Sequence, residues 1–392
     1  MKCYILGAGA SYGYDDKLDE FKRPPLGANI IDAASNIGLL TEDKYPNFLE
    51  FLKWHFSSKG LETPSSYKGI DIESLLDEAA NELDEFNEAH KKELGLEDLE
   101  SYLERIKADP IGFLKEMNSL YTEEEKKSLR RPALLQSCLG ESWYLMYEIF
   151  NHYSSLYKSS LNNYQKLAES HIIEPYNVIS LNYDLIFETA IESVNLYYQY
   201  LYEIKEKSSI PRNKYIDTAK VHGSINWLNP MSEILKLGTD KGKGYELLRV
   251  ISGFPYSNRL QTGDVITLCP KVSIKKNMDS LLRSGDSFNE PILLPPIGRY
   301  KDYNKYPMIT VMWEKARLMI AGASELVFIG TSLREEDTKL RETLRDHSYK
   351  VKNISIAGGG ERLKAELKRL LPNSENIQFQ CFKDFSEYAK TL

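Results

Sequence analysis

The chain has 392 residues, a hydrophobic fraction of 42% and a formal net charge of −7. This length exceeds one ordinary hydrophobic core, so we expect two domains or one domain with large insertions. The acidic balance does not indicate a nucleic-acid partner, and no apolar run approaches the ~18 residues that a membrane-spanning helix needs.

The four cysteines are scattered along the chain and form no C-x-x-C pair; they are Cys3, Cys138, Cys269 and Cys381. This spacing is neither that of a zinc ribbon nor that of a disulfide framework. We therefore expect a reduced, cytoplasmic protein without a bound zinc ion.

The first predicted strand, Cys3 to Leu6, runs directly into the glycine-rich turn Gly7-Ala8-Gly9-Ala10-Ser11. Glycines at this place let the backbone approach a pyrophosphate, which the amides at the start of the next helix can hold. The next glycine is Gly13, so the spacing departs from the usual G-x-G-x-x-G. A tight turn without a ligand is the alternative interpretation.

The segment from Tyr14 to Arg23 is charged and lacks clear periodicity. It predicts a loop beside the glycine turn, either a lid over a nucleotide or an ordinary surface loop. From about residue 41 to 167, apolar residues recur at helical spacing, and we interpret 41–167 as an all-helical insertion. Within it, Glu73 and Asp77 lie one helical turn apart, and a solvated, salt-bridging face explains them more simply than a site does.

Polar side chains follow two further predicted strands. Asn182 and Asp184 come after the strand Tyr176 to Ile179, and His222 comes after Thr218 to Lys220. Ligands of open α/β sheets bind outside the carboxyl ends of the strands, so these three side chains should meet in one crevice. An amide, a carboxylate and an imidazole together suit acid–base chemistry. Asp184 could instead cap the helix that follows it.

Residues 231–288 predict a loop-rich excursion, after which strands and helices alternate again. The strand from Leu326 to Ile329 ends in Gly330-Thr331-Ser332, and the strand from Ile354 to Ala357 ends in Gly358-Gly359-Gly360. This alternation predicts an α/β fold with a Rossmann-like, mostly parallel sheet and helices on both faces. Three glycine-containing turns at one sheet edge favour a dinucleotide site. We expect 1–40 and 168–392 to form this domain.

These motifs also carry a resemblance. The runs Leu181-Asn182-Tyr183-Asp184, Val221 to Trp227, Leu294-Pro295-Pro296 and Trp313 to Asp337 resemble the prokaryotic sirtuin-like domain of anti-phage defence systems. The resemblance covers about the first forty residues and most of the chain after 175, but not the helical insertion. It implies a fold that binds NAD⁺ as a substrate.

The resemblance also implies roles for individual residues. The turn containing Gly7, Ala8, Gly9 and Ser11 would bind the diphosphate, and Gly330, Thr331 and Ser332 would contact the dinucleotide near the adenosine ribose. Asn182 would orient the nicotinamide ribose and a water, Asp184 would support the same pocket, and His222 would act as the base, with Gly223 leaving space over its ring.

One departure from the sirtuin pattern changes the expected reaction. Deacetylating sirtuins carry a four-cysteine zinc module, which this chain lacks, so water is the expected acceptor in place of an acyl-lysine. We therefore predict an NAD⁺ glycohydrolase that releases nicotinamide and ADP-ribose and depletes NAD⁺ during phage infection. A non-catalytic NAD⁺ or ADP-ribose sensor that gates an oligomer, and an ADP-ribosyltransferase, are the alternatives.

The size and layout of the chain resemble the sirtuin-like subunit that works with a HerA-type ring ATPase. That resemblance implies a homo-oligomer and such an ATPase as a partner. Because an unregulated NADase would poison its host, we expect low basal activity, with residues of the insertion or of the loop from Tyr14 to Arg23 blocking the crevice.

Overall fold

A seven-stranded sheet, parallel throughout, forms the centre of the molecule. The computed structural model describes residues 1–60, 67–90, 123–157, 162–200, 211–231, 266–267, 283–284, 287–294, 303 and 307–392. The strands of this sheet are β1 (Lys2–Leu6), β2 (Tyr176–Ser180), β3 (Tyr197–Gln199), β4 (Tyr215–Lys220), β9 (Glu325–Ile329), β10 (Asn353–Ala357) and β11 (Gln378–Phe382). Their order is β11-β10-β9-β1-β2-β4-β3, which confirms the predicted α/β fold class.

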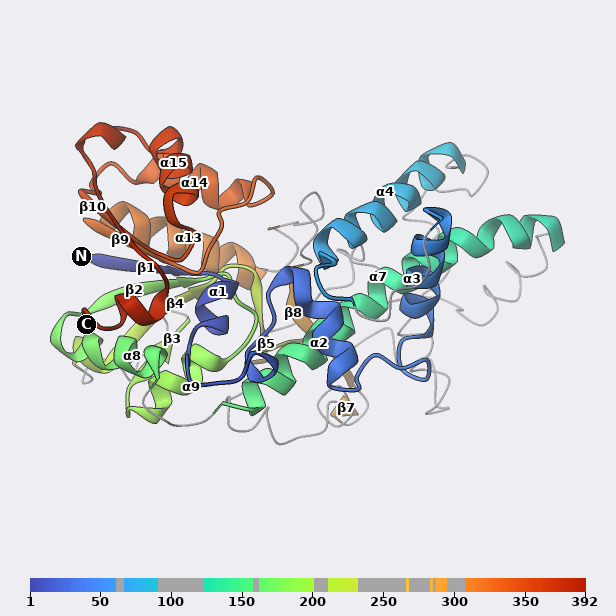
Figure 1. Ribbon diagram of the computed structural model, residues 1–392, viewed down its shortest axis with the longest axis horizontal. Coiled ribbons are helices and arrows are strands. Elements are labelled where there is room, and N and C mark those ends of the chain that lie inside the picture. Colours follow the sequence, from blue (N-terminus) through green and yellow to red (C-terminus); the bar gives the residue numbers. More distant parts are fainter. Residues whose placement is uncertain are drawn as a thin grey trace.

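Helices cover both faces of the sheet (Figure 1). One face carries α13 (Pro307–Gly322), α14 (Thr338–His347) and α15 (Gly360–Leu370), and the other carries α8 (Asn163–Ile173), α9 (Ile186–Ser193) and the short α16 (Phe385–Tyr388). The boundary expected at residue 168 lies inside α8.

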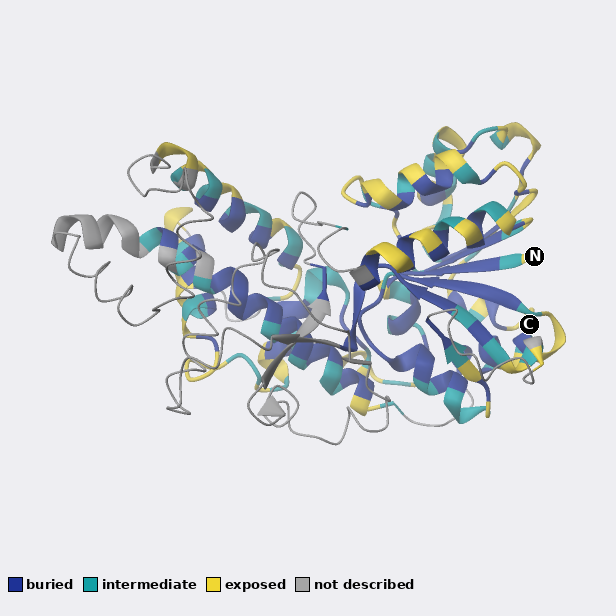
Figure 2. Cartoon of the chain, turned by 180° about the vertical axis from the view of Figure 1, so that it is seen from behind, coloured by how far each residue is buried: buried dark blue, intermediate teal, exposed yellow. Residues whose placement is uncertain are grey.

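The alternation of side chains along the strands explains why two layers of helices are needed. In β1, Cys3 and Ile5 pack into the core under α13 to α15, whereas Tyr4 and Leu6 pack into the core with α8 and α9. A parallel strand that is apolar on both faces must be buried on both. Figure 2 accordingly shows the inner strands of this sheet as largely buried, whereas the edge strand β11 has no buried residue.

The predicted helical insertion contains three long helices in its described part: α3 (Pro46–Ser58), α4 (Ile72–His90) and α7 (Glu123–Ser155). α7 packs against both of the others. Arg131 of α7 holds them together, because its guanidinium forms two hydrogen bonds of 2.7 and 2.8 Å with Glu82 of α4 and lies 3.1 Å from the ring centre of Trp54 of α3. The apolar interior of this bundle is continuous with one core of the sheet.

A second, antiparallel sheet was not predicted. Its strand order is β6-β5-β8-β7, with β5 (Gly223–Met231), β6 (Ile266–Thr267), β7 (Arg283–Ser284) and β8 (Ser287–Leu293). β5 begins directly after His222 and pairs with β8, at the other end of the predicted excursion. Most of the predicted excursion 231–288 lies outside the described residues, as do Pro295 and Pro296.

The remaining elements are short: α1 (Ala8–Tyr12), α2 (Ile30–Asn36), and the 3₁₀ turns η1 (Glu20–Lys22), η2 (Gly27–Asn29), η5 (Arg212–Lys214) and η8 (Ser374–Asn376). The chain leaves β1 towards β2 on one side and later returns to β9 on the other. This reversal makes the carboxyl ends of β1 and β9 the topological switch point, where open α/β sheets bind ligands. Within the described residues, no helix combines the length and hydropathy that a membrane span requires.

Candidate functional site

A cavity of about 610 Å³ lies at this switch point. Its floor is made by the turns that follow β1, β9 and β10, and its walls come from residues 12–27, from α7 and from the start of α4. A volume of this size lies within the range of small-molecule sites, roughly 300–1,000 Å³.

The glycine turns after β1 and β9 interlock. The Gly9 amide donates a hydrogen bond of 2.8 Å to Gly330 O, and the Gly7 amide donates one of 3.0 Å to Ile329 O. A β-carbon on Gly7 would lie 2.6 Å from Gly330 O, and one on Gly9 would lie 2.7 Å from the α-carbon of Gly330. Gly330 itself has φ +61°, a left-handed conformation that favours glycine. The two turns therefore require glycine for mutual packing, whether or not a ligand binds.

This interlocking limits what the first turn can offer to an anion. Of the five amides from Gly7 to Ser11, those of Gly7, Gly9 and Ala10 already donate to main-chain carbonyls. A diphosphate could use at most the amides of Ala8 and Ser11 unless one of these bonds breaks. Since α1 is also only five residues long, its helix dipole is small. Strong anion binding here would need a side-chain cation as well.

Asn182 joins the ends of β2 and β1. Its side-chain nitrogen donates hydrogen bonds of 2.9 Å to Gly7 O and of 2.9 Å to Ser11 Oγ. Gly7 O can only accept, so the nitrogen must be the amide atom that faces it. With both amide hydrogens directed at the glycine turn, Asn182 can act on a water or a ribose hydroxyl only through its carbonyl oxygen.

Asp184 is buried at the start of α9, where its Oδ1 accepts the Ile186 amide at 3.0 Å. Leu185 occupies the N-cap position of α9, so Asp184 is not its N-cap, although it satisfies the amide of the first helical residue. Burial raises the pKa of the Asp184 carboxyl above its usual range, and attraction to Lys220 and hydrogen bonds from Ile186 and Ser11 offset this only in part. Ser154 of α7 accepts the neighbouring Leu185 amide at 3.0 Å, which ties the insertion to the same turn.

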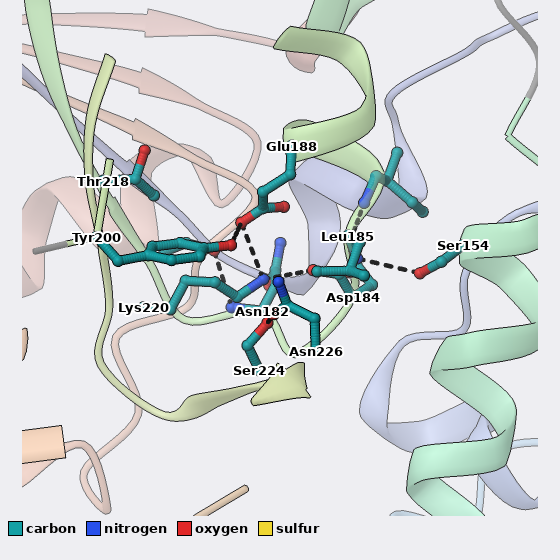
Figure 3. A network of polar contacts seen from close by, with 12 residues as sticks. Ser154, Asn182, Asp184, Leu185, Glu188, Tyr200, Thr218, Lys220, Ser224 and Asn226 are labelled. Carbon is teal, nitrogen blue, oxygen red and sulfur yellow. Dashed lines mark hydrogen bonds and ion pairs between the residues drawn. The ribbon is translucent and has the colours of Figure 1, made fainter. Parts of the chain in front are cut away.

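A buried ion pair between Lys220 and Glu188 contacts the main chain of this turn (Figure 3). Lys220, at the end of β4, is fully buried; its ammonium donates to the main-chain oxygen of Asp184 and lies 3.2 Å from Glu188 Oε1. The Tyr200 hydroxyl donates to the same Glu188 oxygen at 2.9 Å. A buried charge is tolerated only when it is paired and hydrogen-bonded, so these groups constrain the backbone that presents Asn182 and Asp184.

His222 lies two residues beyond β4 and lines the cavity. Its Nε2 is 4.0 Å from Oδ1 of Asp337, a buried residue immediately before α14. The chain changes direction at Gly223, which has φ +97°, and the main-chain oxygen of His222 accepts the Leu294 amide at 2.8 Å. The second sheet thus begins at the residue after His222, and the hydrogen bond from Leu294 fixes the backbone of His222.

The cavity brings together almost all residues that the sequence nominated. The following line it: Gly7, Ala8, Gly9, Ser11, Asn182, Asp184, His222, Gly330, Thr331 and Ser332. Gly223 is not among the lining residues and forms the first residue of β5. Gly358 and Gly359 also line the cavity, so the three glycine-containing turns meet as predicted.

Sequence reasoning did not nominate Arg334 or Asp337, and it assigned Glu73 to a solvated face. All three line the cavity. Arg334 and Asp337 lie two and five residues after the nominated Ser332, so extending the motif would have found them. Glu73 carries no local signal, because its position beside the cavity depends on how the insertion packs.

No cluster of three or more histidine, cysteine or acidic side chains suitable for a metal ion occurs in the described part of the chain. No protein-family model matches this sequence, and no curated protein is significantly similar to it.

Proposed function

We propose that the protein is an NAD⁺ glycohydrolase, which cleaves NAD⁺ to nicotinamide and ADP-ribose. The observation that carries this proposal is the convergence of Asn182, Asp184 and His222 with three glycine-containing turns on one cavity at the switch point of a parallel sheet. The choice of NAD⁺ as the substrate comes from the sequence resemblance to the sirtuin-like domain.

The reaction breaks the bond between the nicotinamide nitrogen and the ribose carbon C1′ and forms a bond from a water oxygen to C1′. Departure of nicotinamide leaves positive charge on the ribose, and the attacking water must lose a proton. His222 is the base that accepts this proton, a contribution typically of ~10²–10⁴-fold. The carboxylate of Asp337, 4.0 Å from Nε2, stabilises the imidazolium that results.

The carbonyl oxygen of Asn182 orients the water, because both amide hydrogens of Asn182 are held by the glycine turn. Asp184, once ionised, stabilises positive charge on the ribose or accepts a ribose hydroxyl. The desolvation that raises its pKa would make an ionised Asp184 a strong electrostatic partner for a cation in the cavity.

The biological setting is part of the same proposal. NAD⁺ depletion would serve abortive infection in anti-phage defence, in a cytoplasmic homo-oligomer that works with a HerA-type ring ATPase. The helical insertion, whose α7 contacts the turn at Leu185, would transmit assembly to the cavity.

The decisive experiment measures nicotinamide release from NAD⁺ by the purified full chain and by His222→Ala, with and without a HerA-type ATPase. We expect release by the wild type and a loss of at least a hundredfold in His222→Ala, with the oligomeric state unchanged in light scattering. NAD⁺ or ADP-ribose binding without turnover under every condition would instead establish the sensor, and label transferred from NAD⁺ to protein would establish the transferase.

A further inference from the structure

We propose that Arg334 is the anion-binding side chain of this cavity, and that Glu73 and Asp71 of the helical insertion occupy its guanidinium in the state described here. The insertion would thereby hold the site at low affinity for the diphosphate of a dinucleotide. This inference rests on the proposed function and specifies how the same site is regulated.

The backbone places Arg334 at the cavity by a turn of unusual geometry. Leu333, which precedes it, is buried and has φ +48°, a left-handed conformation that is uncommon for leucine. The turn is held because Leu333 N–H faces Thr331 Oγ1 at 3.4 Å and Leu333 O accepts from Arg341 Nη1 at 3.3 Å. Strained backbone of this kind is retained where the surroundings fix it, often at ligand sites.

Two carboxylates of the insertion meet the guanidinium. Arg334 Nη1 donates to Glu73 Oε2 at 2.5 Å and lies 3.3 Å from Asp71 Oδ2. The Glu73 amide donates to Asp71 Oδ1 at 3.0 Å, so the two acids form one unit at the start of α4. Arg334 and Glu73 both line the cavity, which means that the pair lies where a ligand would bind.

The cavity is lined by more acidic than basic side chains, so the pairing of Arg334 affects whether an anion can bind. Five carboxylate residues and two guanidinium residues, Arg23 and Arg334, are among the described residues that line it. The guanidinium of Arg23 donates to the main-chain oxygens of Leu18 and Asp16, both at 2.9 Å. A diphosphate that enters therefore meets an excess of negative charge, and the amides of the first glycine turn are mostly committed. Arg23 keeps its charge because its partners are neutral carbonyls, whereas Arg334 becomes available to the diphosphate only when Glu73 and Asp71 are displaced.

The pair also lies where the insertion contacts η2. The Gly69 amide, just before α4, donates to Ala28 O at 3.0 Å. A β-carbon on Gly27 would lie 3.3 Å from Arg334 Nη2 and 3.6 Å from Asp71 Oδ1. A displacement of the start of α4 away from Arg334 would withdraw both acids from its guanidinium. Since coupling between two sites is reciprocal, binding of a diphosphate would in turn loosen this contact.

The test titrates ADP-ribose into the full-length protein by calorimetry and measures nicotinamide release on the same samples. Glu73→Gln should bind ADP-ribose about 5- to 50-fold more tightly than the wild type, a range typical of coupled sites. Arg334→Gln should bind it more weakly. Glu78→Gln is the matched control, because it removes the same charge from α4 at a residue that pairs with Lys59 and His55 away from the cavity.

A double-mutant cycle separates a specific pair from general charge repulsion. In the Arg334→Gln background, Glu73→Gln should lose most of its effect on ADP-ribose affinity. The inference would be overturned if Glu73→Gln had the same effect with and without Arg334. It would also be overturned if Glu78→Gln raised the affinity for ADP-ribose as much as Glu73→Gln does. Neither result would contradict the NADase proposal. If no variant binds ADP-ribose or releases nicotinamide, both proposals are wrong.

Discussion

Gly330 and Ala10 lie so close that a β-carbon on Gly330 would stand 2.1 Å from the amide nitrogen of Ala10. The turns after β9 and β1 are therefore a single packed unit, and the floor of the cavity has no room for a side chain at this point. Among the glycines in the described part of the chain, Gly330 leaves the least room for a β-carbon.

The first prediction follows from this contact. Gly330→Ala should lower the free energy of unfolding by about 2–5 kcal/mol, because the clash adds to the strain of a left-handed alanine. Gly38→Ala is the control: Gly38 has a similar φ of +70° but nothing within 4 Å of its β-carbon position, so only the strain of ~1–2 kcal/mol should remain. Urea denaturation measures both, and equal losses would contradict the packing argument.

The second prediction separates the two roles of Asp184. Asp184→Asn keeps an acceptor for the Ile186 amide, so it should fold as well as the wild type and yet release nicotinamide at least ~10-fold more slowly. Asp184→Ala should in addition lose the hydrogen bond from the Ile186 amide, at a cost of ~1 kcal/mol. Full activity in Asp184→Asn would leave Asp184 with a structural role only.

The raised pKa of Asp184 also gives a pH dependence with a definite sign. Because the folded-state pKa is above the unfolded value of ~3.9, the folded state binds more protons between the two, and stability falls as pH rises through this interval. The wild type should therefore lose stability relative to Asp184→Asn as pH rises from about 4 towards neutrality. Urea midpoints of both proteins across this range test it; a gain for the wild type would mean that attraction to Lys220 outweighs burial.

The third prediction concerns the ion pair between Lys220 and Glu188. Lys220→Met leaves a buried carboxylate without its cation and should cost ~3–5 kcal/mol in the free energy of unfolding. The double variant Lys220→Met/Glu188→Gln should recover part of this loss, since glutamine still accepts from the Tyr200 hydroxyl. Arg345→Met, at an exposed pair with Asp346, should change stability little. Additive losses in the double variant would argue against coupling.

The fourth prediction assigns Asp337 a positioning role that acts through His222. Asp337→Asn should lower kcat for nicotinamide release about 10- to 100-fold with little change in KM, because the imidazolium loses its carboxylate partner. In the His222→Ala background the same substitution should have almost no further effect. Asp346→Asn, at the exposed end of α14, serves as the control. An undiminished loss without His222 would show that Asp337 acts elsewhere.

The sheet could be predicted because its strands carry strong local signals. β1, β2, β9 and β10 are short apolar runs that end in glycine or polar residues, and a run buried on both faces tolerates little else. The antiparallel sheet was missed because the pairing of β5 with β8 joins segments separated by the excursion, and no local pattern shows this.

The residues of the candidate site could be predicted where they follow directly from a predicted strand. Asn182, Asp184 and His222 follow directly from strand ends, so topology brings them together. Lys220 was not predicted to be buried, because a lysine at a strand end is ordinarily solvated and its partners, Glu188 and the main-chain oxygen of Asp184, are brought to it only by the fold. The pair of Arg334 and Glu73 joins residues 261 positions apart, and only the packing of the insertion creates it.

The length of α7 has a mechanical consequence. Met146 and Phe150 near one end line the cavity, and the other end projects away from the sheet (Figure 1). With 33 residues, the helix is ~50 Å long at 1.5 Å per residue, so a tilt of ~6° about the cavity end moves the outer end by ~5 Å. The residues of α7 that line the cavity would therefore shift by only a small fraction of any displacement of the outer end of the helix.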